Sequence, residues 1–209
     1  MILRWTVACL CAVVLLTAAG CGGRPEPAAE TAPAAPPAPE PAPPPVPASN
    51  TAVLVTAAGE ITLELLPDKA PETVAQFKRL AASNFYNGAT FHRVIKDSLI
   101  QGGDPLSKDP DPMNDGEGTC GVLVKGEIND TPMKAGAVAM AHPGDPNAAS
   151  CQFFVCVKDH PEWQGQFTVF ALVTGGMDAV RKISRVSVGT GALADHPIFK
   201  QTIERIDFK

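Results

Sequence analysis

The distribution of proline divides this chain before any fold is considered. Eleven of its 21 prolines lie between Pro25 and Pro47, in a segment otherwise rich in alanine and glutamate. Residues 21–50 therefore lack the apolar periodicity that a buried core requires. As an extended, semi-rigid spacer at ~3.1 Å per residue, such a segment would reach roughly 80–90 Å. The alternative, that its prolines are ligands for a proline-reading domain, remains open. Either way, the only candidate globular domain is residues 51–209.

Residues 1–20 have the pattern of a secretory signal peptide. Arg4 precedes a nearly apolar run over residues 7–19, which is short for a membrane span and ends in small residues. Leu-Thr-Ala-Ala-Gly-Cys at 16–21 resembles the lipobox of bacterial lipoproteins, in which a peptide is cleaved before a cysteine that is then acylated. Several acyl chains on Cys21 would form a durable anchor. We expect an extracytoplasmic protein tethered to a bacterial membrane; the alternative is ordinary cleavage beside an incidental cysteine.

Charge and metal-ligand spacing exclude several function classes. The formal net charge is −5, and Lys and Arg form no cluster, which argues against nucleic-acid binding. The four histidines make no HxxxH or HExxH spacing and no Cys/His cluster, so no metal and no cofactor are expected. We also expect a monomer.

Three cysteines remain after the signal and the lipidation site are set aside. Cys156 follows apolar residues and is predicted to be a small buried side chain on a strand. Cys120 and Cys151 lie in loop-like surroundings and either form a disulfide or stay free, since sequence does not show whether their Cα atoms approach within the ~7 Å limit.

The domain alternates short strand patterns with turn residues. We predict helices from Pro71 to near Asn84 and over residues 177–183, from apolar residues at helical spacing and a proline suited to a first turn. A long loop is predicted over 102–131, and loops of this length are usually functional. The predicted strands cover residues 52–56, 60–66, 91–95, 99–101, 135–141, 151–157, 167–173 and 198–208. The pattern indicates a mainly β fold, a closed antiparallel barrel capped by two α-helices.

One arginine stands out on a predicted apolar strand. Arg93 lies in Phe-His-Arg-Val-Ile at 91–95, shortly before a glycine pair at 102–103. A guanidinium in an apolar neighbourhood is costly unless it is paired or used. It either pairs with a carboxylate such as Asp104 or has a chemical role.

Six motifs in order resemble the cyclophilin family of peptidyl-prolyl cis/trans isomerases, in its short bacterial type. They are Asn-Phe-Tyr-Asn-Gly-Ala-Thr-Phe-His-Arg-Val-Ile at 84–95, Ile-Gln-Gly-Gly-Asp-Pro at 100–105, Gly-Ala-Val-Ala-Met-Ala at 136–141, Gly-Asp-Pro-Asn at 144–147, Gln-Phe-Phe at 152–154 and Phe-Thr-Val-Phe at 167–170. The resemblance covers residues 52–208 and implies an eight-stranded antiparallel β-barrel with a helix at each end. It also implies that X-Pro segments of polypeptides are the substrates.

The resemblance implies a role for each matching position. Arg93 would be the catalytic arginine, Gln101 and Gln152 would position the substrate backbone, and Ala141 and His142 would lie on the floor beside it. Apolar residues would enclose the proline ring, namely Phe91, Met140, Phe154 and Phe167, with Trp163 at the rim.

The chemistry explains why these residue types are needed. Rotation about an X-Pro bond faces a barrier of ~18–20 kcal/mol, because the planar bond has partial double-bond character. Twisting localises a lone pair on the imide nitrogen, and a guanidinium aimed at that nitrogen stabilises the twisted state more than the planar one. Apolar walls hold the ring and exclude water that would screen the charge. No nucleophile is required.

Three positions depart from the family pattern. Ser98 stands where a phenylalanine commonly forms the pocket wall, His142 replaces Asn or Arg, and Cys151 replaces Ser. We therefore expect reduced but real activity, with an altered preference for the residue before proline. Two alternatives are a catalytically idle, membrane-tethered module that holds proline-containing segments, and an envelope protein on a reused barrel, since fold alone does not imply function.

Overall fold

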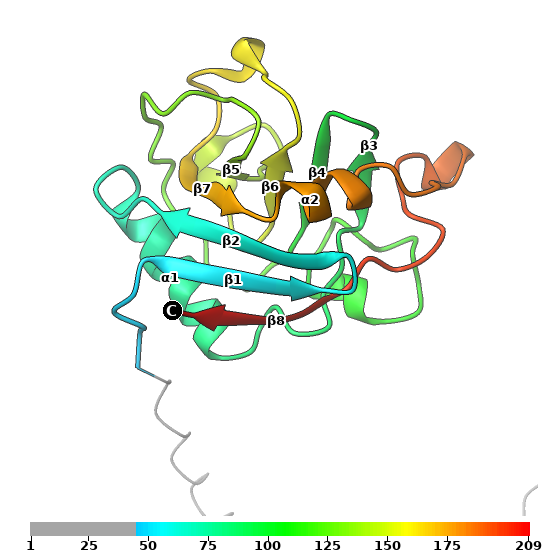
Figure 1. Cartoon of the computed structure of the whole chain (residues 1–209), viewed down its shortest axis with the longest axis horizontal. Helices are drawn as coiled ribbons and strands as arrows, with labels where there is room; N and C mark the ends of the chain where they lie inside the picture. Colours follow the sequence, from blue (N-terminus) through cyan, green and yellow to red (C-terminus); the bar gives the residue numbers. More distant parts are fainter. Residues whose placement is uncertain (1–44) are drawn as a thin grey trace, which may run out of the picture. The chain divides into compact units, whose positions relative to one another are not determined.

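The computed structural model describes residues 45–209 (Figure 1), so the expectations about the signal, Cys21 and most of the linker lie outside the described residues. The strands are β1 (Thr51–Thr56), β2 (Gly59–Leu65), β3 (Arg93–Ile95), β4 (Leu99–Gly102), β5 (Ala137–Met140), β6 (Phe153–Cys156), β7 (Val169–Gly175) and β8 (Ile203–Phe208). The helices are α1 (Pro71–Ala82) and α2 (Met177–Ile183), with single 3₁₀ turns η1 (Leu106–Lys108), η2 (Pro146–Ala148), η3 (Pro161–Trp163) and η4 (Gly191–Leu193).

All eight strands form one antiparallel sheet that curls on itself, in the order β3-β4-β6-β5-β7-β2-β1-β8. The two edges meet through the residues that precede β3 and β8. Thr90 and Thr202 form an antiparallel bridge, and the Phe91 N–H donates to the Gln201 carbonyl at 2.8 Å. The predicted fold, a mainly β eight-stranded antiparallel barrel with two helices, is confirmed.

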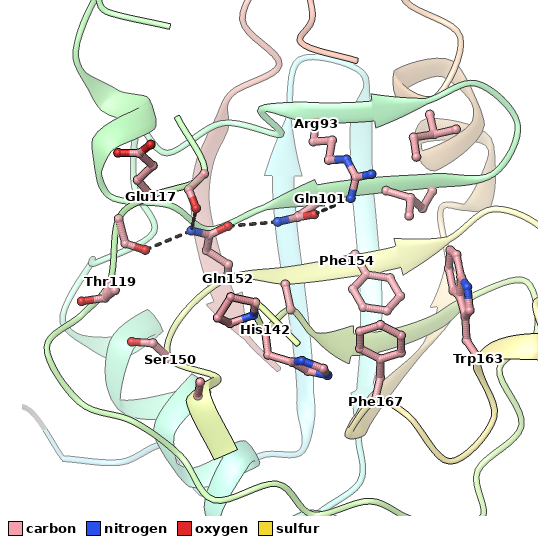
Figure 2. A pocket seen from close by; sticks show the side chains of 17 residues that line it. Arg93, Gln101, Glu117, Thr119, His142, Ser150, Gln152, Phe154, Trp163 and Phe167 are labelled. Carbon is pink, nitrogen blue, oxygen red and sulfur yellow. Dashed lines mark hydrogen bonds between the residues drawn. The ribbon is translucent and has the colours of Figure 1, made fainter. Parts of the chain in front are cut away.

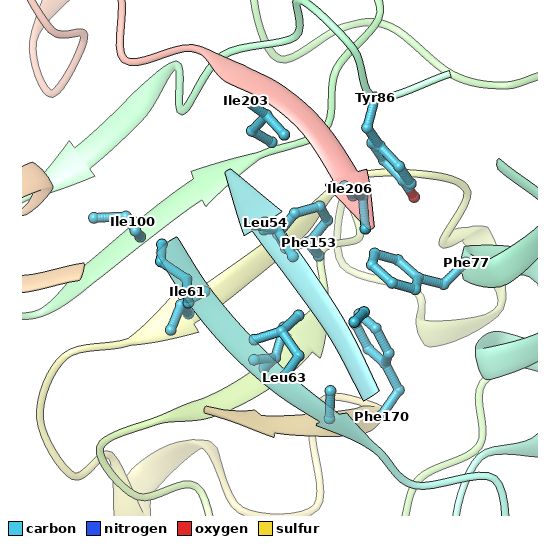
Figure 3. Close-up of a cluster of buried hydrophobic side chains, with 14 of the residues drawn as sticks. Leu54, Ile61, Leu63, Phe77, Tyr86, Ile100, Phe153, Phe170, Ile203 and Ile206 are labelled. Carbon is cyan, nitrogen blue, oxygen red and sulfur yellow. The ribbon is translucent and has the colours of Figure 1, made fainter. Parts of the chain in front are cut away.

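Alternate residues of the strands fill the barrel interior. In β2, Ile61, Leu63 and Leu65 are buried and the residues between them face outward, as their alternation predicts. The interior is rich in aromatic rings. Phe153, for example, packs edge-on against Phe77 from α1, with the ring centroids 5.9 Å apart. Figure 3 shows this cluster enclosed by the curled strands.

Both helices contribute apolar side chains to the same cluster. Helix α1 packs against β8 and α2 against β2, and Phe77 and Val180 are fully buried. The start of α1 has no side-chain cap from its own N-cap residue. Instead, the Glu127 carboxylate from the long loop accepts the backbone N–H groups of Glu72 and Thr73 at 3.0 and 2.8 Å. This carboxylate satisfies two unpaired donors at the positive end of the helix dipole.

The last predicted strand is shorter than its apolar pattern suggested. The prediction of a strand over 198–208 is wrong for its first five residues, since β8 begins at Ile203. Ile198 and Phe199 instead lie on the surface, with Phe199 78% exposed. The segment before them folds back on itself through a bridge between Val188 and Pro197, so it does not join the sheet as a strand.

Two further features of the described residues bear on function. No helix in residues 45–209 has both the length and the apolar character to cross a membrane. Cys120, Cys151 and Cys156 are free thiols, so the Cys120–Cys151 disulfide that the sequence left open is not formed. Burial raises the pKa of both Cys151 and Cys156 to about 12, which keeps these thiols protonated and weakly nucleophilic near neutral pH.

His92 is a buried base beneath the long loop. It is 5% exposed, and neither ring nitrogen has a hydrogen-bond partner among the described residues. Burial lowers the pKa of His92 below its usual 6.5, although the Asp104 and Asp115 carboxylates oppose this shift. The unfolded chain therefore binds a proton more readily than the folded domain does.

This difference predicts a pH-dependent stability. The contribution of neutral His92 is fully present above the unfolded pKa and is lost as the pH falls from there through the lower folded pKa. In His92→Gln, which has no titrating ring, the free energy of unfolding should fall less than in the wild type between about pH 7 and 5. Urea unfolding across this range measures it, and parallel curves for the two proteins would contradict the prediction.

Candidate active site

One row of side chains crosses the outer face of the sheet. The antiparallel register places Arg93 of β3 opposite Gln101 of β4, Gln101 opposite Phe154 of β6, and Phe154 opposite Ala139 of β5. Because side chains alternate between faces, their neighbours Val94, Ile100 and Phe153 point into the barrel instead. Three strands thus bring a guanidinium, an amide and an aromatic ring to one surface.

The polar residues of this row form a chain of hydrogen bonds. Arg93 Nη1 donates to Gln101 Oε1 at 3.4 Å, and Gln101 Nε2 donates to Gln152 Oε1 at 3.0 Å. Gln152 Nε2 in turn donates to the carbonyls of Gly116 and Gly118 at 2.8 and 2.9 Å. Since carbonyls only accept, they determine the orientation of Gln152 and through it that of Gln101. Figure 2 shows the chain running from Arg93 to the loop at Glu117 and Thr119.

The sequence around Arg93 suggested an arginine buried in an apolar strand, but its side chain is not buried. Its side chain is 48% exposed, and Nε lies 3.8 Å from Asp195 Oδ2. The predicted alternative partner, Asp104, does not contact it. The guanidinium therefore keeps donors available at the pocket surface, with one loose ion pair of the kind that contributes little to stability.

Asp104 instead organises the loop that carries the two glycine carbonyls. It is fully buried, its Oδ1 accepts the Leu106 N–H at 2.7 Å, and its Oδ2 accepts the N–H groups of Gly116 and, at 3.2 Å, Gly118. A side chain at Gly118 would not fit, because a Cβ atom there would lie 1.9 Å from Asp104 Oδ1. The carboxylate thus anchors the loop against the barrel.

Three aromatic rings form the apolar side of the site. Phe154 meets Phe167 edge-on with centroids 5.0 Å apart, and Trp163 meets Phe154 in the same way at 5.8 Å. Leu99 of β4 and Ile95 of β3 extend this wall. In Figure 2 the rings lie beside the polar chain, so the site combines an apolar wall with a row of donors.

His142 closes the site between these two parts. Its ring lies over Phe167 with the centroids 4.7 Å apart. Nε2 lies 3.1 Å from the Gln166 carbonyl, which only accepts, while Nδ1 accepts the Gly144 N–H at 3.2 Å. These partners select the neutral tautomer that carries its proton on Nε2.

Together these groups line a pocket of about 590 Å³, a size that suits a small ligand or a short peptide segment. All but two of the residues predicted for the site line it: Arg93, Gln101, Ala141, His142, Gln152, Phe154, Trp163 and Phe167. Phe91 and Met140 do not. Both lie in the barrel interior. Phe91 precedes β3, which begins only at Arg93. Met140 points to the opposite face of the sheet from its neighbour Ala139.

The structure adds residues that the sequence reasoning missed. Strand alternation alone would have found Ile95, two residues after Arg93, and Leu99, two residues before Gln101. No local signal marks the loop residues that complete the lining, among them Glu117, Thr119 and Ser150. Within residues 45–209, no group of three or more His, Cys, Asp or Glu side chains is arranged to hold a metal ion.

Comparison with known proteins assigns the family. The family model for the cyclophilin type of peptidyl-prolyl cis-trans isomerase matches residues 51–207. The chain is a cyclophilin. It is 40% identical over 162 residues to a probable peptidyl-prolyl cis-trans isomerase of Brucella suis, covering 74% of this chain and 83% of that one. It is also 39% identical over 137 residues to peptidyl-prolyl cis-trans isomerase B of Bacillus subtilis, covering 65% and 90% of the two chains.

A solved structure agrees with this assignment. A cyclophilin-type isomerase from Cryptosporidium parvum, crystallised in the presence of the dipeptide Ala-Pro, aligns with a TM-score of 0.68 at 25% identity. The alignment covers 76% of this chain and 98% of the other. The present cyclophilin is therefore a peptidyl-prolyl cis-trans isomerase, and proline-containing peptides are its substrate class.

The Ser98 side chain is not part of the pocket lining of this cyclophilin. The pocket lining includes its neighbour Leu99 and not Ser98 itself. The Ser98 hydroxyl lies 3.1 Å from His160 Nε2. The residue at this position therefore joins the β3–β4 turn to the segment that carries Trp163.

The loop anchor gives a stability prediction. Asp104→Ala leaves three backbone N–H groups without an acceptor, and each lost bond of this kind costs about 1–3 kcal/mol. The free energy of unfolding should fall by about 3–5 kcal/mol, and turnover should fall because the Gly116 and Gly118 carbonyls no longer hold Gln152. Urea unfolding and an isomerase assay measure both effects.

A matched control is available in the same loop. Asp111 is exposed and accepts a single backbone N–H, that of Met113, at 3.0 Å. Asp111→Ala should change the free energy of unfolding by about 1 kcal/mol or less. Equal losses in the two variants would show that Asp104 does not anchor the loop.

Proposed function

We propose that this cyclophilin isomerises X-Pro bonds in extracytoplasmic polypeptides and assists their folding, with Arg93 as the catalytic residue. The observation that carries the proposal is the placement of one partly exposed guanidinium between an apolar wall and a row of oriented amides. In this proposal Phe154 and Phe167 hold the proline ring, while Gln101 and Gln152 bind the substrate backbone.

Catalysis then follows from differential stabilisation. The planar X-Pro bond presents little charge on its nitrogen, whereas the twisted bond presents a localised lone pair. The Arg93 guanidinium interacts more strongly with the twisted state, which lowers the barrier without a covalent step. The rings of Phe154 and Phe167 keep the proline still while the preceding carbonyl swings, and they reduce the water that would screen Arg93.

The preformed network supports this assignment. Gln101 and Gln152 are oriented by hydrogen bonds within the protein itself, so peptide binding does not have to order them. Gln101 also accepts from Arg93, which restrains the guanidinium on the sheet surface. Fixed donors that need little reorganisation are the kind of electrostatic element that accelerates reactions most.

A second candidate function uses the same pocket. A module that grips proline-containing segments without turning them over would need the aromatic wall and the two glutamines but not the guanidinium. The aromatic wall of the pocket and the loose Arg93–Asp195 pair allow such binding. Turnover and binding must therefore be measured separately.

The location of the protein is part of the proposal. The apolar run at 7–19 followed by Cys21 supports export and lipidation, and the proline-rich residues 22–50 support a spacer between a membrane and the isomerase domain. Substrates would then be unfolded segments of proteins outside the cytoplasm.

Removing the guanidinium tests the catalytic assignment. In Arg93→Ala, kcat/KM for a peptide with one Ala-Pro bond should fall by about 10²–10³, the usual loss for one preorganised donor at a developing charge. Peptide affinity should fall much less. Arg205→Ala, which removes an arginine paired with Asp207 on β8, should leave both unchanged. Equal loss of turnover and affinity in Arg93→Ala would favour the binding module.

Lipidation is tested at a single sulfur. In a bacterial host supplied with an alkyne-bearing fatty acid, the wild-type chain should incorporate the label and remain with the membrane fraction, because several acyl chains anchor durably. Cys21→Ser should lose the label, and Cys120→Ser should keep it. Undiminished labelling of Cys21→Ser would contradict the proposed anchor.

A further inference from the structure

We propose that His160 is a positioning residue for Trp163, and that His160 and Ser98 together fix the rim of the prolyl pocket and set how tightly it holds a peptide. The inference rests on the proposed function of that pocket. It assigns a role to a buried histidine that neither contacts the pocket nor belongs to the Arg93 network.

The indole of Trp163 is enclosed from two sides. The imidazole of His160 stacks flat on it, with ring centroids 3.7 Å apart and an angle of 2° between the planes. Phe154 and Phe167 approach it from the pocket side at 5.8 and 6.0 Å. Trp163 lies on the single turn η3 within an exposed loop, so the stack and these rings restrain an otherwise mobile side chain.

His160 is itself held through its backbone and through both of its ring nitrogens. His160 is 2% exposed, and its backbone N–H donates to the Met133 carbonyl at 2.7 Å. Nδ1 lies 2.8 Å from Glu162 Oε1, and Nε2 lies 3.1 Å from the Ser98 hydroxyl and 3.3 Å from the Ser98 carbonyl. Both ring nitrogens thus have polar partners, so the ring cannot turn without losing contacts on both sides.

The Ser98 bond connects two walls of the pocket. Ser98 directly precedes Leu99, a lining residue of β4, while His160 supports Trp163 on the opposite loop. The two apolar walls are thus linked through two contacts of Ser98 with the His160 ring, one from its hydroxyl and one from its backbone carbonyl. A phenylalanine at position 98 would keep the carbonyl contact and lose the hydroxyl contact.

This arrangement affects binding more than chemistry. Ordering a free side chain on binding weakens affinity by about two- to tenfold, and the stack removes that penalty by ordering Trp163 in advance. Arg93 lies on β3 and makes no bond to His160 or Trp163 among the described residues. Loss of the stack should therefore raise KM and leave kcat nearly unchanged.

The experiment uses the full chain in a mild detergent with Trp5→Phe, which leaves Trp163 as its only tryptophan. His160→Leu should raise KM for an Ala-Pro peptide about two- to tenfold, with kcat within about twofold, and weaken peptide affinity measured by Trp163 fluorescence to the same degree. The near-UV circular dichroism of Trp163 should shrink. His160→Phe keeps a ring against the indole. It should therefore recover part of the lost peptide affinity and part of the lost near-UV signal.

Thermal unfolding establishes that each variant is folded. Ser98→Ala removes only the hydroxyl, so it should show a smaller change in the same direction and keeps the test available if His160→Leu does not fold. A folded His160→Leu with wild-type KM and an unchanged Trp163 signal would overturn the inference. If the wild type binds peptide but shows no turnover, while His160→Leu binds more weakly, the proposed function fails and the inference is supported.

Discussion

The register between β3, β4 and β6 is the constraint on which the site depends. It aligns Arg93, Gln101 and Phe154 in one row, and each is adjacent in its strand to a residue of the barrel core. A slip of one residue would turn the guanidinium into the interior and bring Val94 or Ile100 to the surface. The buried neighbours of these functional residues therefore maintain the site, since the apolar interior penalises this one-residue slip.

The second level of organisation is the long loop, which the barrel holds through polar rather than apolar contacts. Asp104 gathers three backbone N–H groups of the loop, and Glu127 caps α1 from the loop's other half. The Gly116 and Gly118 carbonyls that result orient Gln152. The buried carboxylate of Asp104 thus determines, through the loop, how the Gln152 amide is oriented at the pocket surface. A loop of this length keeps one shape because Asp104 and Glu127 each bind several backbone N–H groups.

Features of the fold and of the pocket could be predicted from the sequence where nearby residues in the chain determine them. The barrel, both helices and eight of the 17 residues that line the pocket followed from strand alternation and from the motifs at 84–105 and 136–170. Phe91 and Met140 were misplaced because a motif shows which residues occur and not which face they occupy. Position 91 precedes the first residue of β3, and position 140 has the parity of the core. Glu117 was missed because its neighbours Gly116 and Gly118 are held by Asp104 and Gln152. Ser150 was missed because its hydrogen bonds are made to Cys120 and Val122, which are distant in the sequence.

The same distinction applies to Ser98, which a motif comparison treats only as the loss of a large apolar side chain. In the structure the wall is supplied by Leu99, and the hydroxyl is used to hold His160 behind Trp163. The effect of a departure from a family pattern can therefore depend on a residue that lies 62 positions away in the chain. Because a buried imidazole left without its partners would be costly, Ser98, His160 and Glu162 act as a unit. The effect of substituting any one of these three residues depends on the other two, so the role of each cannot be interpreted from its own position alone.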